Sequence, residues 1–510
     1  MYKKRKLILF FFLFSFVILL FASKFSFLYA FNDWQDANSF LTVARSILNG
    51  KILYKDIIEQ KGPLLYFIYC LGYLFNFKQI NGIFILEIIN LTIIMYFSNL
   101  ILEMYKKTPI NKYMSIIFGL IICTSASFTH GGSAEEFCLS FLIISLYYFN
   151  KNFVVNFLTK KEFFLVGVIT ACIFFIKLNL IFLPFFSIIC ICIEEFFKKN
   201  YKNILNVLVY FSLGVFFLSL IFIIYFVIND NFNDFLYCYF IINGKFYIDN
   251  NFGILYRMYI AYQLSIKNLS VNVMSLYLFI LYSLFVFKGN KKLKLRLYTV
   301  LIYIFMSIGI YMGVKYYIYY ALPLFVIFIY SFVFAIQFIY EKKIIGIIED
   351  KKLVLRVIFF LLVPLLSYNF ANYKNYLFLR KEDFAQYRIS NKILKYKESP
   401  VVLNYGELDY GFYNILNVVP DCKYFHRMNI PYEKMKENYS FQKEYIDKGN
   451  VDFVIVGIKS NKEEKSKKEL ISDLEWINEK YDLIYCDKQY YESDIINFYV
   501  FMVNDKYKQT

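Results

Sequence analysis

Histidine, proline and acidic residues are scarce in this 510-residue sequence, which has 2 His, 8 Pro and 39 Asp and Glu against 56 Lys and Arg. Since His130 and His426 are the only histidines and no CxxC or HExxH spacing occurs, the usual zinc-ligand motifs are missing. The acidic deficit leaves a net charge of +17. The basic residues lie in short clusters between apolar runs, as in the cytoplasmic loops of polytopic membrane proteins, and this argues against a nucleic-acid partner.

Apolar residues are abundant instead. Of the chain, 59% is hydrophobic and 22% aromatic, which is too apolar for an ordinary soluble domain. Repeated apolar runs of about 20 residues can cross a hydrocarbon core of about 30 Å as helices. The start of the chain, with its basic head and apolar core, resembles a secretory signal, and the many later runs favour an uncleaved signal anchor.

The basic clusters predict how the chain threads the membrane. Lys3, Lys4, Arg5 and Lys6 place the N-terminus inside. About eleven spans are predicted, at 7–28, 80–104, 113–129, 137–150, 162–177, 180–197, 204–228, 270–288, 297–313, 318–340 and 353–371. The short apolar stretch 63–77 is interpreted as an interfacial or re-entrant helix, because counting it as a span would put the basic residues of 105–112 outside.

Two domains are predicted. Residues 1–372 form a mainly α-helical transmembrane domain, with a first outer loop at about 30–79 and a second at about 229–268. Residues 373–510 change character: short β-branched runs such as 451–458 and 481–491 alternate with charged helical stretches such as 460–480. This pattern predicts an α/β domain on the outer face, where Cys422 and Cys486 could form a disulfide.

The first outer loop contains a predicted amphipathic helix at 36–50. Its apolar residues recur at helical spacing and are Phe40, Val43, Ala44, Ile47 and Leu48. Asp36 stands at or near the N-cap, where the helix dipole favours a carboxylate, so the simplest interpretation is a helix cap. Asp33 is nearer the span and is expected to be solvated.

The same loop carries a family resemblance. Asp36 is followed eight and nine positions later by Ala44 and Arg45, then by "NGK.LY.D" and by "KGPLLYFI" at the start of the interfacial helix. This pattern resembles the first outer loop of the GT-C glycosyltransferases, in the branch that includes the aminoarabinose transferase of lipid A and the protein O-mannosyltransferases. Those membrane enzymes move a sugar from a polyprenyl-phosphate carrier to an acceptor outside the cytoplasm. The resemblance covers about the first 200 residues. Beyond them, only the architecture is similar, namely further spans followed by an outer domain.

The resemblance implies a catalytic role for Asp36. The sugar phosphate already has a good leaving group, so the difficult step is activation of an acceptor hydroxyl, and a carboxylate can take that proton. Direct attack would be a single displacement that inverts the anomeric carbon. The family often has a second carboxylate in the next outer loop, which here falls on Glu135 and Glu136 in "HGGSAEEF". It would bind the acceptor, position the base or hold a divalent cation such as Mg²⁺ or Mn²⁺; alternatively, both residues simply favour a helix N-terminus.

Three lysines are predicted on the outer side, where positioned cations can stabilise the donor phosphate: Lys61, Lys177 and Lys315. Lys177 at the end of a span could also simply extend toward the interface. Relatives often have arginine at the position of Lys315 and a histidine shortly after it. The sequence "KYYIYY" has neither, so this correspondence is weaker.

Further substrate-binding candidates are Asp33, Arg45, Tyr54 and Asp56 in the first outer loop, and His426 and Arg427 in "PDCKYFHRMN" of the outer domain. An ordinary exposed loop is the simpler interpretation of this last segment. Glu87 lies inside a predicted span, where a carboxylate is costly unless it is paired or faces a wet cavity, and it is expected to line the same cavity.

The sequence therefore predicts a multi-pass protein of a bacterial inner membrane, with its C-terminal domain outside, that transfers sugar from a lipid-linked donor to a glycan, lipid or protein. Two rival functions remain. A polysaccharide polymerase or ligase would place its key basic residues in later outer loops, and a transporter would show repeated halves with broken helices. A structural anchor would not need eleven spans.

Overall fold

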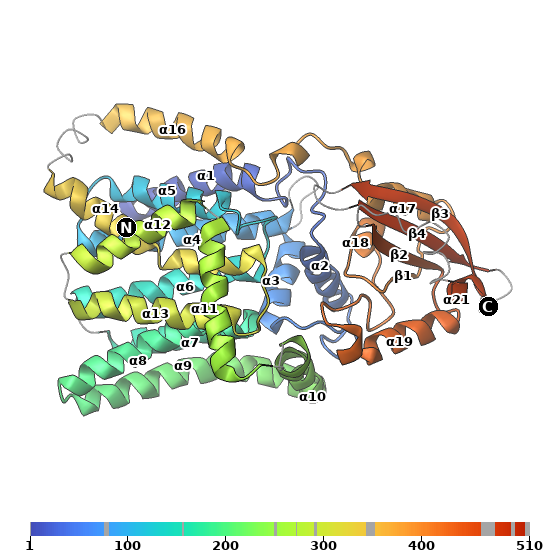
Figure 1. Ribbon diagram of the computed structural model, residues 1–510, viewed down its shortest axis with the longest axis horizontal. Helices are drawn as coiled ribbons and strands as arrows, with labels where there is room; N and C mark the ends of the chain where they lie inside the picture. Colours follow the sequence, from blue (N-terminus) through green and yellow to red (C-terminus); the bar gives the residue numbers. More distant parts are fainter. Residues whose placement is uncertain are drawn as a thin grey trace.

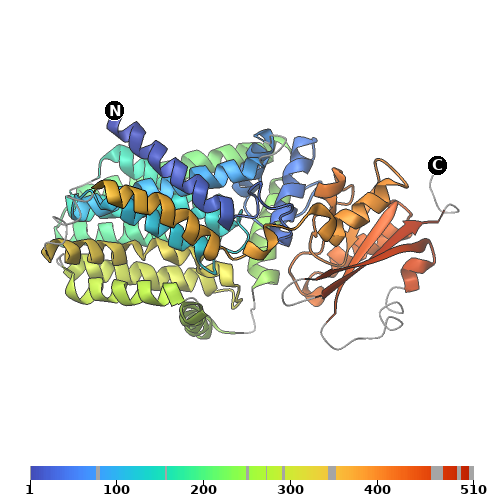
Figure 2. The same ribbon diagram turned by 90° about the horizontal axis from the view of Figure 1, so that it is seen from above.

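The computed structural model is elongated, with a helical bundle at one end, a small α/β domain at the other and helix α2 between them (Figures 1 and 2). The structure describes residues 2–75, 81–155, 158–248, 252–271, 273–289, 293–342, 352–460, 475–490 and 495–504. The mainly helical fold with a C-terminal α/β domain confirms the predicted fold class.

Each predicted span overlaps a helix of the bundle. These helices are α1 (Tyr2–Ala22), α4 (Gly82–Tyr105), α5 (Asn111–Thr124), α6 (Ala134–Asn150), α7 (Lys160–Ile176), α8 (Phe182–Phe197), α9 (Tyr201–Ile228), α12 (Val273–Lys288), α13 (Leu293–Tyr311), α14 (Ile329–Glu341) and α16 (Lys352–Asn369). The predicted span 318–340 is divided into a 3-10 helix (Ile318–Val326) and α14, which meet at a bend of 45°. Within the described residues, six helical segments are long and apolar enough to cross a membrane, or up to eight if each of two bent pairs is one span. The prediction of about eleven is met only if α5, α7 and α16 are added, and α5 has just 14 residues.

Most of the predicted outer loop 229–268 is helical. It contains α10 (Phe232–Phe235), a π-helical stretch (Leu236–Tyr247) and α11 (Ile254–Val271). Helix α11 lies across the bundle and meets α12 at a bend of 110° (Figure 1). Its apolar residues are interrupted by Arg257 and Lys267, which dilute the hydropathy signal in the sequence.

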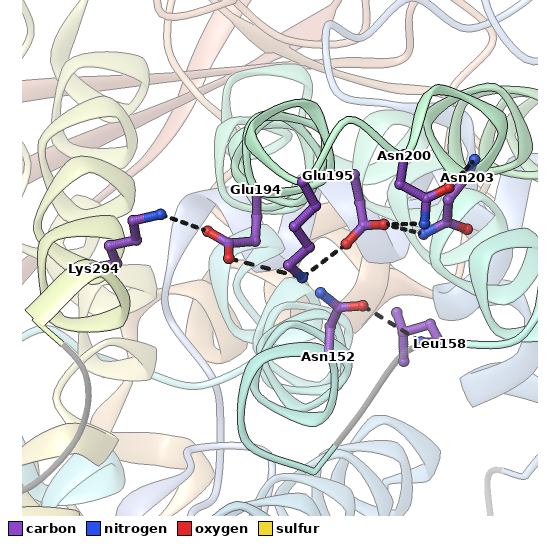
Figure 3. Close-up of polar contacts among 8 residues, drawn as sticks. Asn152, Leu158, Glu194, Glu195, Asn200, Asn203 and Lys294 are labelled. Carbon is purple, nitrogen blue, oxygen red and sulfur yellow. Dashed lines mark hydrogen bonds and ion pairs between the residues drawn. The ribbon is translucent and has the colours of Figure 1, made fainter.

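A polar cluster joins three helices at the end of the bundle away from the α/β domain (Figures 1 and 3). Glu194, near the end of α8, lies 3.5 Å from the ammonium of Lys294 at the start of α13. The carboxylate of Glu195 accepts bonds of 2.9 Å from Asn200 and Asn203 at the start of α9. The end of α8, the start of α9 and the start of α13 therefore meet at one end of the bundle.

The α/β domain has a four-stranded sheet in the order β1-β2-β4-β3. β1 (Val402–Tyr405) is parallel to β2 (Phe453–Ser460), and β4 (Ile495–Val503) is antiparallel to both β2 and β3 (Tyr481–Tyr490). Its helices are α17 (Ala385–Leu394), α18 (Phe412–Leu416), α19 (Lys436–Asp447) and α21 (Glu475–Asn478). Both predicted strands are confirmed, whereas most of the predicted helical stretch 460–480 lies outside the described residues.

Cys422 does not form the disulfide that the sequence left open. Its buried thiol donates to the carbonyl oxygen of Tyr424 at 3.4 Å, while Cys486 lies exposed on β3. The outer domain is held together by its sheet and apolar core instead.

The first outer loop forms α2 (Gln35–Leu48) and α3 (Pro63–Leu74), and the outer domain packs on α2. Phe40, Val43 and Ala44 of the predicted apolar face are buried, whereas Leu48 at the end of the helix is exposed. The Arg45 guanidinium donates to the Tyr413 carbonyl oxygen at 3.1 Å, so Arg45 binds α2 to the outer domain. The Thr42 hydroxyl donates to Asp409 at 2.6 Å. The outer domain thus fixes the helix that carries Asp36.

The Asp409 carboxyl makes this contact sensitive to pH. Burial raises its pKa from 3.8 to about 6, although the hydrogen bonds from Thr42 and Gly411 act to lower it. The folded protein therefore binds this proton more tightly than the unfolded chain, so this carboxyl lowers the free energy of unfolding as pH rises from about 4 to 6. The rise from 3.8 to about 6 corresponds to about 3 kcal/mol at most.

Asp409→Asn is expected to remove this pH dependence, because an uncharged amide can bond to both Thr42 and the Gly411 amide. Thermal unfolding of both proteins between pH 4 and pH 7, followed by intrinsic fluorescence, measures the difference. The exposed Asp421→Asn is the control and should retain the wild-type slope. An unchanged slope in Asp409→Asn would contradict the assignment.

Candidate active site

Asp36 is the second residue of α2, two positions after the N-cap residue Trp34. Its position near the cap is confirmed, but its carboxylate accepts a bond of 3.4 Å from the hydroxyl of Tyr319, in the 3-10 helix Ile318–Val326. Asp36 therefore connects α2 to a segment 283 positions away, and a local capping role does not account for it.

Asp36 lines a small pocket of about 330 Å³, here called the carboxylate pocket. Its lining residues are Asp36, Ser39, Phe40, Glu59, Gln60, Lys61, Tyr247, Tyr319, Leu408, His426 and Asn429. Burial raises the pKa of Asp36; the charges of Lys61 and Lys177 oppose this rise, and the charge of Glu59 adds to it. A carboxylate with a raised pKa is a stronger base than an exposed one.

Lys61 lies between Asp36 and Glu59. Burial alone would lower its pKa, but the two carboxylates outweigh burial and raise it, so the side chain is a permanent cation. Its backbone is fixed, because its carbonyl oxygen accepts a bond of 2.6 Å from Tyr54 and its amide donates to Tyr66 at 3.2 Å. Among the described residues, its ammonium forms no ion pair within 4.0 Å. It can therefore bind an incoming anion.

Glu59 is a site residue that the sequence analysis missed. It is buried, accepts a short hydrogen bond from the Tyr66 hydroxyl, and accepts a bond of 3.1 Å from the Lys61 amide. The sequence did offer one indication of its role. Glu59 stands two residues before Lys61, and a lysine on the outer side is expected to have a carboxylate near it.

A second, larger pocket of about 880 Å³ adjoins the first and is here called the lysine pocket. All three predicted phosphate-binding lysines, Lys61, Lys177 and Lys315, line it. Lys61 and Tyr247 line both pockets, so the two are neighbours. The Lys315 ammonium lies 3.5 Å from the centroid of the Tyr247 ring and donates to the Asn429 carbonyl oxygen at 3.2 Å.

The walls of the lysine pocket are mostly apolar. They are formed by side chains that include Ile176, Leu178, Phe240, Ile248, Ile310 and Met312. Such a pocket suits an amphiphile whose anionic group meets the lysines and whose hydrocarbon part packs on the walls.

Glu135 and Glu136 are both buried in the first turn of α6, but they have different partners. Glu135 forms a short ion pair with Lys177, whose ammonium lies 4.2 Å from the centroid of the Tyr320 ring. Glu136 accepts a bond of 2.7 Å from the Gly132 amide. Glu135 thus supports the lysine pocket, whereas Glu136 stabilises the turn before its own helix.

Glu87 does not line either pocket, contrary to expectation. It is fully buried in α4 and accepts a bond of 2.7 Å from the Ser23 hydroxyl, with Glu136 next to it. It therefore belongs to the interior of the bundle.

His426 brings the outer domain into the carboxylate pocket. It is buried, its Nδ1 lies 3.2 Å from the Ser39 hydroxyl oxygen, and its Nε2 has no hydrogen-bond partner among the described residues. Burial, followed by the charge of Lys61, lowers its pKa to about 3, so the imidazole is neutral at physiological pH. The interpretation of this segment as an ordinary exposed loop is wrong for His426, because its ring stacks on Phe425 at 4.1 Å and the chain packs on α2.

Arg427, Asp33 and Asp56 lie outside both pockets. Arg427 pairs with Glu407 at 3.8 Å, and Asp56 accepts a bond of 2.7 Å from the Ile52 amide. Asp33 is buried 2.5 Å from the Lys24 ammonium, so its expected solvation is wrong. A buried charge needs a partner of opposite charge, which Lys24 provides. The sequence does not show that the chain folds back over Asp33.

A divalent cation was one of the roles that the sequence left open for the carboxylates of the site. No group of three or more His, Cys, Asp or Glu side chains gathers anywhere in the described part of the chain. Mg²⁺ and Mn²⁺ prefer oxygen ligands, yet Glu135 already pairs with Lys177 and Asp36 faces Lys61. We therefore assign no step to a metal.

No family model and no curated protein matches this sequence. The fold, however, is similar to that in the crystal structure of ArnT from Cupriavidus metallidurans bound to undecaprenyl phosphate. The two align with a TM-score of 0.61 over 95% of this chain and 97% of that chain, at 12% sequence identity. The chain therefore shares its overall fold with that ArnT structure, as the resemblance of the first outer loop implies.

Proposed function

Proceeding from the fold shared with ArnT, we propose that this multi-pass membrane protein is a glycosyltransferase with a polyprenyl-phosphate-linked sugar as donor and a hydroxyl group as acceptor. One observation carries the proposal: a pocket with apolar walls and three lysines adjoins a pocket with a buried carboxylate, and Lys61 lines both. The ArnT structure contains undecaprenyl phosphate, a ligand of the same amphiphilic chemistry.

The lysine pocket would hold the donor. The isoprenoid chain would pack on its apolar walls, and the phosphate would face Lys61, Lys177 and Lys315. As the bond between the anomeric carbon and the phosphate oxygen breaks, negative charge collects on the phosphate. Cations fixed in advance stabilise that charge without reorganising during the reaction.

The carboxylate pocket would hold the acceptor hydroxyl. Asp36 takes its proton while the hydroxyl oxygen attacks the anomeric carbon from the face opposite the phosphate. Carbon–oxygen bond formation and loss of the phosphate occur in one displacement, which inverts the anomeric configuration. The raised pKa of Asp36 favours this proton transfer near neutral pH.

His426 would position the acceptor. Its neutral ring is held through Ser39, and its Nε2 is left for a hydroxyl of the acceptor sugar or lipid. Because the imidazole is neutral at neutral pH, it would act through hydrogen bonding and not as an acid. Glu59 would hold Lys61 in place between the two substrates.

We place the enzyme in a bacterial inner membrane with the outer domain on the non-cytoplasmic face. The support is that the end of α8, the start of α9 and the start of α13, with their basic residues, meet at the end of the bundle away from the α/β domain (Figures 1 and 3). The two pockets then lie toward the α/β domain, at the depth where the head group of a lipid-linked sugar is found.

Purified protein in nanodiscs, given radiolabelled polyprenyl-phosphate sugars and a membrane-glycan acceptor extract, tests the function. We expect transfer of label with inversion, inhibited by undecaprenyl phosphate but not by undecaprenol, which lacks the phosphate. The His426→Phe variant should keep donor binding and lose transfer.

Binding of undecaprenyl phosphate without any transfer would favour a lipid-linked-glycan transporter. Failure to bind it would contradict the proposal altogether. Extension of a lipid-linked glycan as product would point to the polymerase or ligase alternative.

A further inference from the structure

A third pocket, of about 680 Å³, lies against α2 and is here called the asparagine pocket. It is lined by the segment 24–32 after α1, by Asn38 and Leu41 of α2, by Asn81, and by Tyr387, Asn414 and Ile415 of the outer domain. Asn38 follows Asp36 by two positions, which is about 200° around a helix. The asparagine pocket and the carboxylate pocket therefore lie on opposite sides of the first turn of α2.

The polar groups of this pocket are mainly side-chain amides. Asn414 donates to the Asn38 carbonyl oxygen at 3.1 Å, and the amide of Asn38 donates to the carbonyl oxygen of Asn32 at 2.9 Å. Asn32 accepts a bond of 3.1 Å from the Trp34 amide through Oδ1. Its Nδ2 has no partner in the described part of the chain, although the residue is only 7% exposed. A buried donor without a partner is costly, so an incoming oxygen would stabilise it.

Aromatic rings form the other part of the lining. The Phe31 and Tyr387 rings meet edge to face, with centroids 5.6 Å apart. Among the described residues, the one charged lining residue is Lys24, and its ammonium is neutralised by Asp33 at 2.5 Å. The described lining of the pocket thus offers amides and aromatic faces with no uncompensated charge. This combination suits a ligand that is rich in hydroxyls and has apolar C–H faces.

We infer that the asparagine pocket binds a neutral sugar unit of the acceptor glycan. The inference rests on the proposed function and narrows its acceptor class, since a phosphorylated lipid head group or a charged peptide would meet no counter-charge there. A helix with its side chains is about 10 Å across. A short oligosaccharide can therefore occupy this pocket while presenting its terminal hydroxyl to Asp36 on the other side of α2.

Saturation-transfer NMR on the full-length protein in nanodiscs tests the inference. The probes are maltotriose, cellotriose, mannotriose and chitotriose, with trigalacturonate as the charged counterpart. We expect saturable binding of at least one neutral trisaccharide and none of trigalacturonate. Tyr387→Ala, which removes an aromatic face, and Ala30→Trp, which fills the pocket, should each weaken binding about tenfold or more. Tyr396→Ala, at a half-exposed tyrosine just after α17, should bind as the wild type does.

Absence of binding by every neutral trisaccharide, or binding that survives both pocket variants, would overturn the inference. The transfer assay separates it from the proposed function. If transfer occurs and the acceptor KM is unchanged in both variants, this inference alone fails. If a trisaccharide binds in the pocket and no donor reacts, the proposed function fails while the glycan site stands.

Discussion

Asp36→Asn is expected to reduce sugar transfer by about 10²- to 10⁴-fold, the usual contribution of a positioned general base. The amide is nearly isosteric and can still accept the bond from Tyr319, so the fold and donor binding should be retained. The variant removes a single function, namely the capacity to take the acceptor proton. Rates with a fixed donor, together with the Kd for undecaprenyl phosphate, measure both effects.

The pH profile of the wild type gives an independent check. Because burial raises the pKa of Asp36, the acidic limb of kcat/KM should lie above the ordinary value of 3.8, with activity lost as pH falls through it. Asp421→Asn, at an exposed position, is the matched control. If Asp36→Asn turns over at the wild-type rate, the base lies elsewhere, and Glu59 is the next carboxylate to test, since Glu135 is held by Lys177.

Lys61→Met should have the second-largest effect, a loss of about 10²- to 10³-fold in kcat, comparable to removal of one preorganised group that stabilises transition-state charge. Lys61 lies between Asp36 and Glu59, so its loss leaves two carboxylates close together without a cation. Mutual repulsion would then raise the pKa of Asp36 further. We therefore expect weaker undecaprenyl-phosphate binding and an acidic limb displaced to higher pH.

Lys55→Met provides the comparison, because Lys55 is an exposed lysine of the same loop. It should leave the rate, donor Kd and pH profile unchanged. A Lys61→Met variant with weaker donor binding but an unaltered pH profile would show that Lys61 does not act on Asp36. Normal donor binding would remove it from the phosphate site.

The sequence singled out the three lysines that line one pocket, for a physical reason. Basic residues on the outer side contradict the usual charge bias, so Lys61, Lys177 and Lys315 were identifiable one by one, and the structure brings them to one pocket. Asp36 was identifiable because its loop combines several motifs at fixed spacing.

The rest of the site could not be predicted because it depends on contacts between distant segments. His426 lies 387 positions from Ser39, and no local pattern in "KYFHRMN" indicates that its ring is buried against α2. Asp33 was misjudged for the same reason, since its partner Lys24 lies within a turn that folds back over it. Helix α11 was missed because its charged residues dilute its apolar pattern.

The carboxylate pocket draws residues from both ends of the chain, from Asp36 to Asn429. During synthesis the helix that bears Asp36 is therefore made early, while the residues that enclose it emerge only after all the membrane helices. A partly synthesised chain already inserted in the bilayer would have this carboxylate exposed to water and no enclosed site. If the proposed function holds, the protein would thus acquire its activity in the final stage of its own biogenesis, and loss of the last hundred or so residues would inactivate it even with every membrane helix in place.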